Sequence, residues 1–317
     1  MSAENHSDAE NDPYFITCNP DYDTTIEIFK FVFQAAYIFV AAVLHYLILR
    51  TVLWKNREEF VGNSFFSIYA ADSIVSFAIL LLDGFVNRPL MFIPPLCSIF
   101  APIFAYPNLF WKLVMILSNY LKAAKSMTQI FMSFNRMTCA VWPLEYLQMW
   151  RNRVKFALLT IFITPVGAIF NLVVSRILIA SIYGGFRNNY IRKISWASLP
   201  FQHLIFILVA IFFTIICTII AVYALLMLKS STNSVKGAER SLCIANIILS
   251  IGFICAAGAQ AAIVFCSFCQ GFLLFMIHIW CIDFLNVSSP LVMLFVSKHF
   301  RAKVLGFKTA KVFMQSK

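Results

Sequence analysis

Seven hydrophobic runs dominate the chain, and each is long enough to cross the hydrocarbon core of a membrane, which takes about 20 residues of helix. Polar and apolar residues do not alternate with a period of two inside these runs, so the pattern predicts spanning helices and not the strands of a barrel. We therefore predict an all-α polytopic membrane protein, a bundle of seven transmembrane helices. The predicted spans are residues 29–49, 65–82, 113–134, 156–179, 204–228, 242–265 and 272–296.

The third run differs from the others because polar residues recur along it at helical spacing. Intervals of three and four residues place them on one face of a helix, whereas the remaining faces are almost entirely apolar. A charge that faces lipid is costly, so this polar stripe must face other protein or an enclosed cavity. The segment is predicted at the centre of the bundle, and its stripe consists of Asn119, Lys122, Ser126, Gln129, Ser133 and Arg136.

The distribution of charge predicts the orientation of the bundle. Only 12% of the residues are charged and 61% are hydrophobic, which is the composition of a membrane protein, so the net charge of +11 does not indicate a nucleic-acid partner. With the amino terminus outside, sixteen Lys and Arg residues lie on the cytoplasmic side and four on the opposite side. The positive-inside rule then predicts an outer amino terminus and a cytoplasmic carboxyl terminus.

The two ends of the chain flank a predicted receptor domain at residues 26–297. Residues 1–25 carry six acids and no Lys or Arg, which predicts a short disordered extracellular head without a cleaved signal peptide. Asn5 begins a glycosylation sequon in this head. In the basic tail, residues 298–317, one helical face carries Phe300, Val304 and Phe307, which predicts either a short amphipathic helix on the inner leaflet or a frayed end.

Four ionisable side chains in or near the spans lie at depths where they can compensate one another. At about 1.5 Å per residue, Lys125 lies near the midplane of the membrane, Lys122 lies in the outer half about level with Asp283, and Asp72 lies in the inner half. An unpaired ion there would neutralise, so we hypothesise a pair between Lys122 and Asp283. These charges, with Asn119 and Gln129, are candidates for ligand contact; a purely structural ion pair or a lysine that reaches outward is the alternative.

Cysteine and proline residues supply further candidates. Cys18 and Cys97 both fall in predicted extracellular segments, where they either form a disulfide or remain two thiols. Pro165 in the fourth span and Pro290 in the seventh act either as hinges or as static kinks, because proline frees a backbone carbonyl within a helix.

Catalytic motifs are absent from the sequence. It contains no HExxH, no phosphate-binding Walker loop and no GxSxG, so we expect neither an enzyme nor a resident metal or other cofactor. The alternatives to a receptor are a small-molecule transporter, although inverted repeats are not visible, and a ligand-gated channel subunit of the insect odorant-receptor kind, whose termini would be reversed.

Several short motifs are distributed along the chain. The third helix ends in FNRM and is followed by WPLEY at residues 142–146. Others are CNPDY at 18–22, NSFF at 63–66 with ADSI at 71–74, IPPLC at 93–97, NRMT at 135–138 with Pro143, and ERSL at 239–242. In the end of its third helix the chain resembles the nematode serpentine chemoreceptors, and in the other motifs it resembles their class gamma (Srg).

The resemblance implies a receptor like those coupled to heterotrimeric G proteins, located in the sensory membrane of chemosensory neurons and binding a small environmental molecule. Arg136 would correspond to the arginine of the Asp/Glu-Arg-Tyr triplet of rhodopsin-like receptors, and Asp72 to their second-helix aspartate. Asn135 replaces the acid of that triplet, Ser289 precedes Pro290 where those receptors have asparagine, and Trp111 stands near the position of their third-helix cysteine. The partner surface would consist of the cytoplasmic loops 51–62, 138–155 and 229–240.

Overall fold

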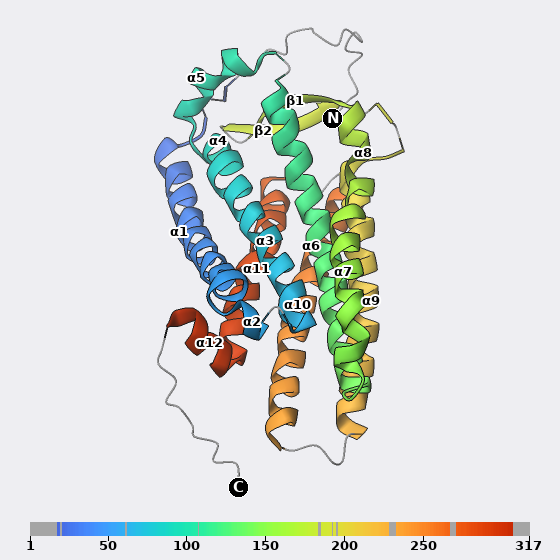
Figure 1. The fold of residues 1–317 in the computed structure, drawn as a ribbon. Helices are drawn as coiled ribbons and strands as arrows, with labels where there is room; N and C mark the ends of the chain where they lie inside the picture. The colour runs from blue at the N-terminus through green and yellow to red at the C-terminus, as the bar shows by residue number, and fades with distance from the viewer. Residues whose placement is uncertain are drawn as a thin grey trace.

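The computed structural model describes residues 18–19, 21–60, 62–106, 108–182, 185–191, 193–194, 196–227, 233–266 and 271–306. Helices run side by side along one direction, a β-hairpin lies across one end of the bundle, and a short helix lies at the other (Figure 1). We refer to these as the hairpin end and the α12 end. The glycosylation candidate Asn5 and the tail residue Phe307 fall outside the described residues.

The membrane-spanning segments correspond to the predicted hydrophobic runs. Within the described residues, six helical segments are long and apolar enough to cross a membrane, and α6, taken together with α5 (Pro95–Phe104), makes a seventh. Their outward faces expose large apolar side chains such as Phe29, Phe212 and Leu226, the surface that a span presents to lipid. The long helices are α1 (Thr24–Leu49), α3 (Ser64–Leu82), α6 (Leu109–Val141), α7 (Tyr146–Ile163), α9 (Leu199–Met227), α10 (Asn233–Phe265) and α11 (Phe272–Val296).

The second span is longer than the hydrophobic run predicted. The chain continues beyond α3 through a π-helical turn, η2 (Asp83–Asn87), into α4 (Arg88–Phe92). Pro89 lies in the first turn of α4, where a missing N–H is tolerated. This extension carries Asp83, Asn87 and Arg88 into the bundle; after it, α5 (Pro95–Phe104) lies over the hairpin end.

The fourth span, Tyr146–Val174, begins and ends earlier in the sequence than predicted. Its helix breaks at Thr164 and Pro165, resumes as α8 (Val166–Val174), and gives way at Arg176 to a strand, so the predicted limit at residue 179 was wrong. A continuous apolar run does not by itself distinguish helix from strand. Antiparallel pairing of β1 (Arg176–Ile182) with β2 (Gly185–Ile191) decides the outcome here.

The polar stripe faces inward, as its pattern predicts. Helix α6 packs against α3 on one side and α9 on the other. Five of the six stripe residues are buried, and the side chain of the sixth, Lys122, is 25% exposed. The helix therefore brings a row of polar groups to the centre of the bundle, where each requires a partner.

The apolar face of α12 (Lys298–Leu305) packs against protein at the α12 end. The Phe300 ring is fully buried, with its centroid 5.6 Å from that of Phe60 and 5.3 Å from that of Phe66. Val304 is buried beside it. The expectation that this face rests on the inner leaflet was therefore wrong, because aromatic side chains of α2 (Arg57–Phe60) and α3 cover it.

A hydrogen-bonded contact also joins α12 to α2. Glu59 Oε2 accepts from Lys303 Nζ at 3.0 Å, and Glu59 Oε1 lies 2.7 Å from His299 Nε2. The hydrogen bonds with His299 and Lys303 lower the pKa of the Glu59 carboxyl. Helix α2, which precedes α3, is thus held against α12.

Gly185 allows β2 to lie directly on α4. A Cβ atom built at this position would overlap the backbone carbonyl oxygens of Leu90 and Met91. Backbone atoms cannot move aside as a flexible side chain can, so Gly185→Ala should lower the free energy of unfolding by about 1–3 kcal/mol. Thermal unfolding of the purified protein in detergent measures this effect.

Gly258→Ala is the matched control, because nothing lies within 4 Å of a Cβ built at that position in α10. It should leave the protein unchanged or stabilise it by about 0.5–1 kcal/mol, the helical preference for alanine. A wild-type melting temperature for Gly185→Ala would contradict the close packing of the hairpin.

Candidate functional site

A cavity of about 170 Å³ lies beneath the hairpin, and we call it the hairpin-end cavity. Residues from seven elements converge on it, namely η2, α4, α6, β1, β2, α9 and α11. Its polar wall consists of Asp83, Asn87, Arg88, Ser118, Asn119, Lys122, Arg187, Asn188, His278 and Asp283, and its apolar wall of Leu90, Met91, Met115, Ile179, Phe186, Leu199, Phe275, Ile279 and Ile282.

Arg88 and Asp283 form a buried ion pair on one side of this cavity. Arg88 also donates to Gln34 Oε1 at 2.9 Å and to the Tyr37 hydroxyl at 3.2 Å, and that hydroxyl donates to the second oxygen of Asp283. Removing any one member would leave a buried polar group unpaired. The pair therefore joins α1, α4 and α11 at the hairpin end.

Lys122 faces Asp83 rather than Asp283. The ammonium lies 3.4 Å from Asp83 Oδ2, while Asp83 Oδ1 accepts from Asn87 at 2.8 Å and from Ser118 at 3.4 Å. The hypothesis of a Lys122–Asp283 pair was therefore wrong. The hypothesis failed because the second span extends further than predicted. This extension brings Asp83 to Lys122 and Arg88 to Asp283.

Lys125 and Asp72 form a second, fully enclosed ion pair near the middle of the bundle. Lys125 Nζ lies 2.8 and 2.9 Å from the two carboxylate oxygens and 2.7 Å from Ser76 Oγ. Asp72 is fully buried and also accepts from Thr128 at 2.6 Å and Ser289 at 2.9 Å. Every polar group of the pair has a partner, as a stable buried ion pair requires.

A smaller cavity of about 20 Å³ lies between the Arg88–Asp283 pair and the Lys125–Asp72 pair. It shares Lys122, His278 and Ile282 with the hairpin-end cavity. His278 Nδ1 and His203 Nε2 are buried, and within the described part of the chain neither has a hydrogen-bond partner. Asn119, by contrast, donates to the Met115 carbonyl of its own helix at 2.7 Å. The unused hydrogen-bonding capacity thus gathers around Lys122.

Toward the α12 end, the stripe continues into hydrogen bonds with α9 and α10. Gln129 and Ser133 each donate to Asn246 Oδ1 at 3.1 Å, and Asn246 donates in turn to Thr218 at 3.0 Å. Gln129 is therefore occupied between helices and lines none of the cavities described.

Asn135 and Arg136 occupy different environments at the α12 end. Asn135 donates to Ser64 Oγ at 2.8 Å and accepts from the Tyr146 hydroxyl at 2.9 Å, which ties α6 to α3 and α7. The Arg136 guanidinium stacks 3.4 Å above the centroid of the Phe65 ring and lines a small cavity with residues of α10 and α11. The Arg136 side chain therefore lies among α3, α10 and α11 at the α12 end.

The two proline candidates differ in what they do to their helices. Pro165 stands at a two-residue interruption between α7 and α8, whereas Pro290 lies within α11. A proline at position 290 cannot donate to the carbonyl of Asn286, four residues earlier. His45 Nε2 donates to that carbonyl at 2.9 Å, so a side chain of α1 replaces the missing backbone donor.

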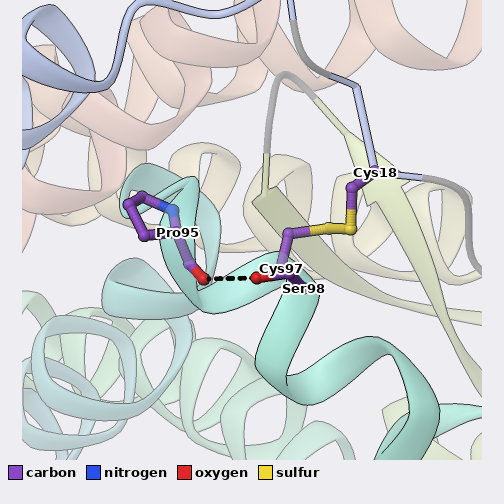
Figure 2. Close-up of a disulfide and its surroundings, with 4 residues drawn as sticks. All are labelled: Cys18, Pro95, Cys97 and Ser98. Atoms are coloured by element: carbon purple, nitrogen blue, oxygen red, sulfur yellow. Dashed lines mark hydrogen bonds between the residues drawn. A yellow bond between two sulfur atoms is a disulfide. The ribbon is translucent and has the colours of Figure 1, made fainter.

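A disulfide joins Cys18 to Cys97, with Cα atoms 5.9 Å apart, so the structure has the bonded form of the two alternatives (Figure 2). Cys97 lies in the first turns of α5, near the hydrogen bond of Ser98 with Pro95. It is buried with Phe104, Ile179 and Phe186. The bond thus anchors the segment before α1 to the elements that cover the hairpin-end cavity.

The residues that sequence reasoning missed are Asp83, Arg88, Arg187 and the two histidines. A signal for the first of these was present, because Asp72, Ser76, Asp83 and Asn87 recur at helical spacing on one face. The proline-rich stretch after residue 87 hid it by implying that the helix had ended. Among the described residues, no three His, Cys, Asp or Glu side chains are grouped to hold a metal ion.

Lys125→Met should destabilise the protein by about 3–5 kcal/mol, because it leaves Asp72 charged, buried and without its cation. Combining it with Asp72→Asn should recover most of the loss, since an asparagine can keep the hydrogen bonds with Thr128 and Ser289. Surface expression and thermal unfolding in detergent measure both effects. Lys112→Met on the same helix, outside the network, is the control; additive losses in the double variant would contradict the ion pair.

Comparison with known proteins agrees with this architecture over nearly the whole chain. A family model described as Srg family chemoreceptor matches residues 31–304. Three similar proteins, all from Caenorhabditis elegans, are serpentine receptor class gamma-16 (39% identical over 296 residues, 92% of this chain and 89% of the relative), class gamma-15 (37% over 302 residues, 95% and 93%) and class gamma-11 (37% over 295 residues, 93% and 87%). The chain, a multi-pass bundle of seven membrane helices with a cavity of mixed polar and apolar lining at one end, belongs to the Srg family of chemoreceptors.

Proposed function

We propose that this chain binds a small molecule in the hairpin-end cavity and transmits the signal to a heterotrimeric G protein at the α12 end. The observation that carries the proposal is the polar stripe of α6, which runs from Lys122 in the wall of the cavity to Arg136 at the opposite end. The relatives are named as serpentine receptors and the family as chemoreceptors, which supports this class of function without identifying a ligand.

We place the hairpin end outside the cell and the α12 end in the cytoplasm. Basic residues gather in the segments near α2, α7 and α12, as the positive-inside rule requires of the cytoplasmic side. The Cys18–Cys97 disulfide lies at the hairpin end, which suits an oxidising compartment. With this orientation, residues 1–25 form the outer head and residues 298–317 the inner tail of a receptor in the plasma membrane, and we propose the sensory membrane of chemosensory neurons as its location.

The signal would pass along the helices that two buried ion pairs, Arg88–Asp283 and Lys125–Asp72, hold together. A ligand that contacts Lys122 or the Arg88–Asp283 pair acts on α6 and α11 together. Lower in the bundle the same two helices meet at Asp72, which accepts from Lys125 and Ser289, directly before Pro290. A shift of α11 at this proline would alter the surroundings of Arg136 and so change the population of a state open to the partner.

The partner surface would consist of residues 51–62, 138–155 and 229–240, of which 61 and 229–232 lie outside the described residues. The sequence predicts these segments as loops, but the structure has much of them in helix, including the end of α6 and the starts of α7 and α10. Arg136 lies between these segments, stacked on Phe65. Position 135 is an asparagine and not an acid, so no carboxylate there restrains the arginine. Asn135 bonds to Ser64 and Tyr146 instead. The family is one of chemoreceptors, and we assign no catalytic role to any residue.

Epitope access tests the orientation. An epitope at the amino terminus should be detected by antibody on intact cells, and one at the carboxyl terminus only after permeabilisation. The reversed result would contradict the assignment and favour the channel-subunit topology.

Coupling through Arg136 is tested in cells that express the receptor with a G-protein α-subunit and a calcium indicator, exposed to a panel of volatile and water-soluble compounds. For any compound that activates the wild type, Arg136→Ala should reduce the response at least about tenfold, because the coupling cation is lost, while surface expression stays the same.

Arg50→Ala is the matched control, since Arg50 is an exposed arginine near the same end of the bundle and lies outside the three segments of the proposed partner surface. It should respond like the wild type. A full response of Arg136→Ala at equal expression would contradict its role in coupling.

A further inference from the structure

We infer that the hairpin-end cavity selects a small organic anion, a compound with one carboxylate-like group and a compact apolar part. The inference rests on the proposed function of this cavity as the ligand site and names the chemistry of the ligand. Three observations carry it: the balance of charge in the wall, the use of the hydrogen-bonding groups, and the size and lining of the space.

Among its described residues, the wall carries three cations, Arg88, Lys122 and Arg187, and two carboxylates, Asp83 and Asp283. Arg88 is paired with Asp283, and the Arg187 guanidinium lies 4.2 Å from the centroid of the Phe275 ring, so Lys122 is the cation on which the inference rests. Inside a protein the effective dielectric constant is far below that of water, so an incoming opposite charge is favoured beside such a cation. An anionic group would add a second partner for Lys122, and a cationic group would add a further positive charge beside it.

The acceptors of the wall are already in use. One oxygen of Asp283 accepts from Arg88 and the other from Tyr37. One oxygen of Asp83 accepts from Asn87 and Ser118, and the other faces Lys122. Every oxygen of the two carboxylates therefore already faces a donor, so an ammonium ligand would have to share acceptors that protein groups hold.

The donors, by contrast, are in surplus at Lys122. An ammonium has three N–H groups, and the described contact of this one is with Asp83 at 3.4 Å. Lys125, only one turn away along α6, is bonded to both oxygens of Asp72 and to Ser76. Lys122 lines both cavities together with His278, whose Nδ1 is buried without a partner among the described residues.

The shape of the site sets the size of the ligand. A cavity of about 150 Å³ is known to hold a benzene molecule, and the hairpin-end cavity measures about 170 Å³. Its apolar wall includes Met115, Phe186, Phe275 and Ile282. A ring or a chain of about six carbons can pack against these side chains while the charged group lies at Lys122.

The test compares ligands that differ only in charge. Purified wild-type receptor in detergent is heated with benzoate, benzylammonium or benzyl alcohol, and in a second series with hexanoate, hexylammonium or 1-hexanol, at neutral pH. We expect the carboxylates to raise the melting temperature in a concentration-dependent way, because they bind the folded state, and the ammonium and alcohol compounds to leave it unchanged.

Variants locate the effect. Lys122→Gln should weaken carboxylate binding about ten- to hundredfold, the usual result of losing a hydrogen bond to a charged group, whereas Lys122→Arg should retain it. Lys112→Gln, on the same helix but lining neither cavity, should bind like the wild type. Asp83→Asn should strengthen binding several-fold, because it removes the negative charge that faces Lys122 while Asn87 and Ser118 keep their partner.

Three results would overturn the inference: equal stabilisation by the alcohols or ammonium compounds, wild-type binding by Lys122→Gln, or no stabilisation by either carboxylate at any concentration. The wild-type comparison stands even where a variant does not fold. The assay contains no G protein, so a receptor that binds carboxylates without signalling would contradict the proposed function alone. A receptor that signals only in response to amines would contradict this inference alone.

Discussion

A buried cation must have a buried anion beside it, and the structure is arranged around that requirement. Lys125 lies in the middle of α6 with its charge fully enclosed, and Asp72 of α3 meets it with both oxygens. Ser289 of α11 donates to the same carboxylate. Because these contacts need three helices at one depth and one rotation, they define how α3, α6 and α11 pack, and the apolar contacts around them follow.

Two lysines one turn apart on α6 have different roles because their surroundings differ. The hydrogen bonds of Lys125 are saturated and its side chain is 6% exposed, so it suits a structural role. Lys122 is 25% exposed, borders both cavities and has a single described contact with a carboxylate that other donors also hold. Availability, and not the mere presence of a charge in the membrane, separates the candidate ligand contact from the structural ion.

Toward the α12 end, polar groups that lack their usual partner bond to side chains of other helices. Pro290 leaves the Asn286 carbonyl without a backbone donor, and His45 of α1 supplies one. At the end of α6, Asn135 bonds to Ser64 and Tyr146 instead of to the neighbouring arginine. Arg136 stacks on Phe65. Helix α11 is therefore tied to α1 and α3 by side chains around its proline, which makes this region sensitive to movement at the other end.

The sequence by itself determined the membrane class, the number of spans, the inward polar face of the third helix and the pair of cysteines at one end. Exposing polar groups to lipid is costly, so the positions of polar and apolar residues along the chain show which segments span and which faces turn inward. Only the tertiary structure decided which charges meet. The apolar pattern ended the second span at residue 82, yet a π-helical turn carries it on to Phe92 and brings Asp83 to Lys122 and Arg88 to Asp283. Likewise, the run at 156–179 contains both a helix and a strand, since apolarity alone does not choose between them. Pairing depends on where each helix stops and how it is rotated, and packing against distant segments sets both.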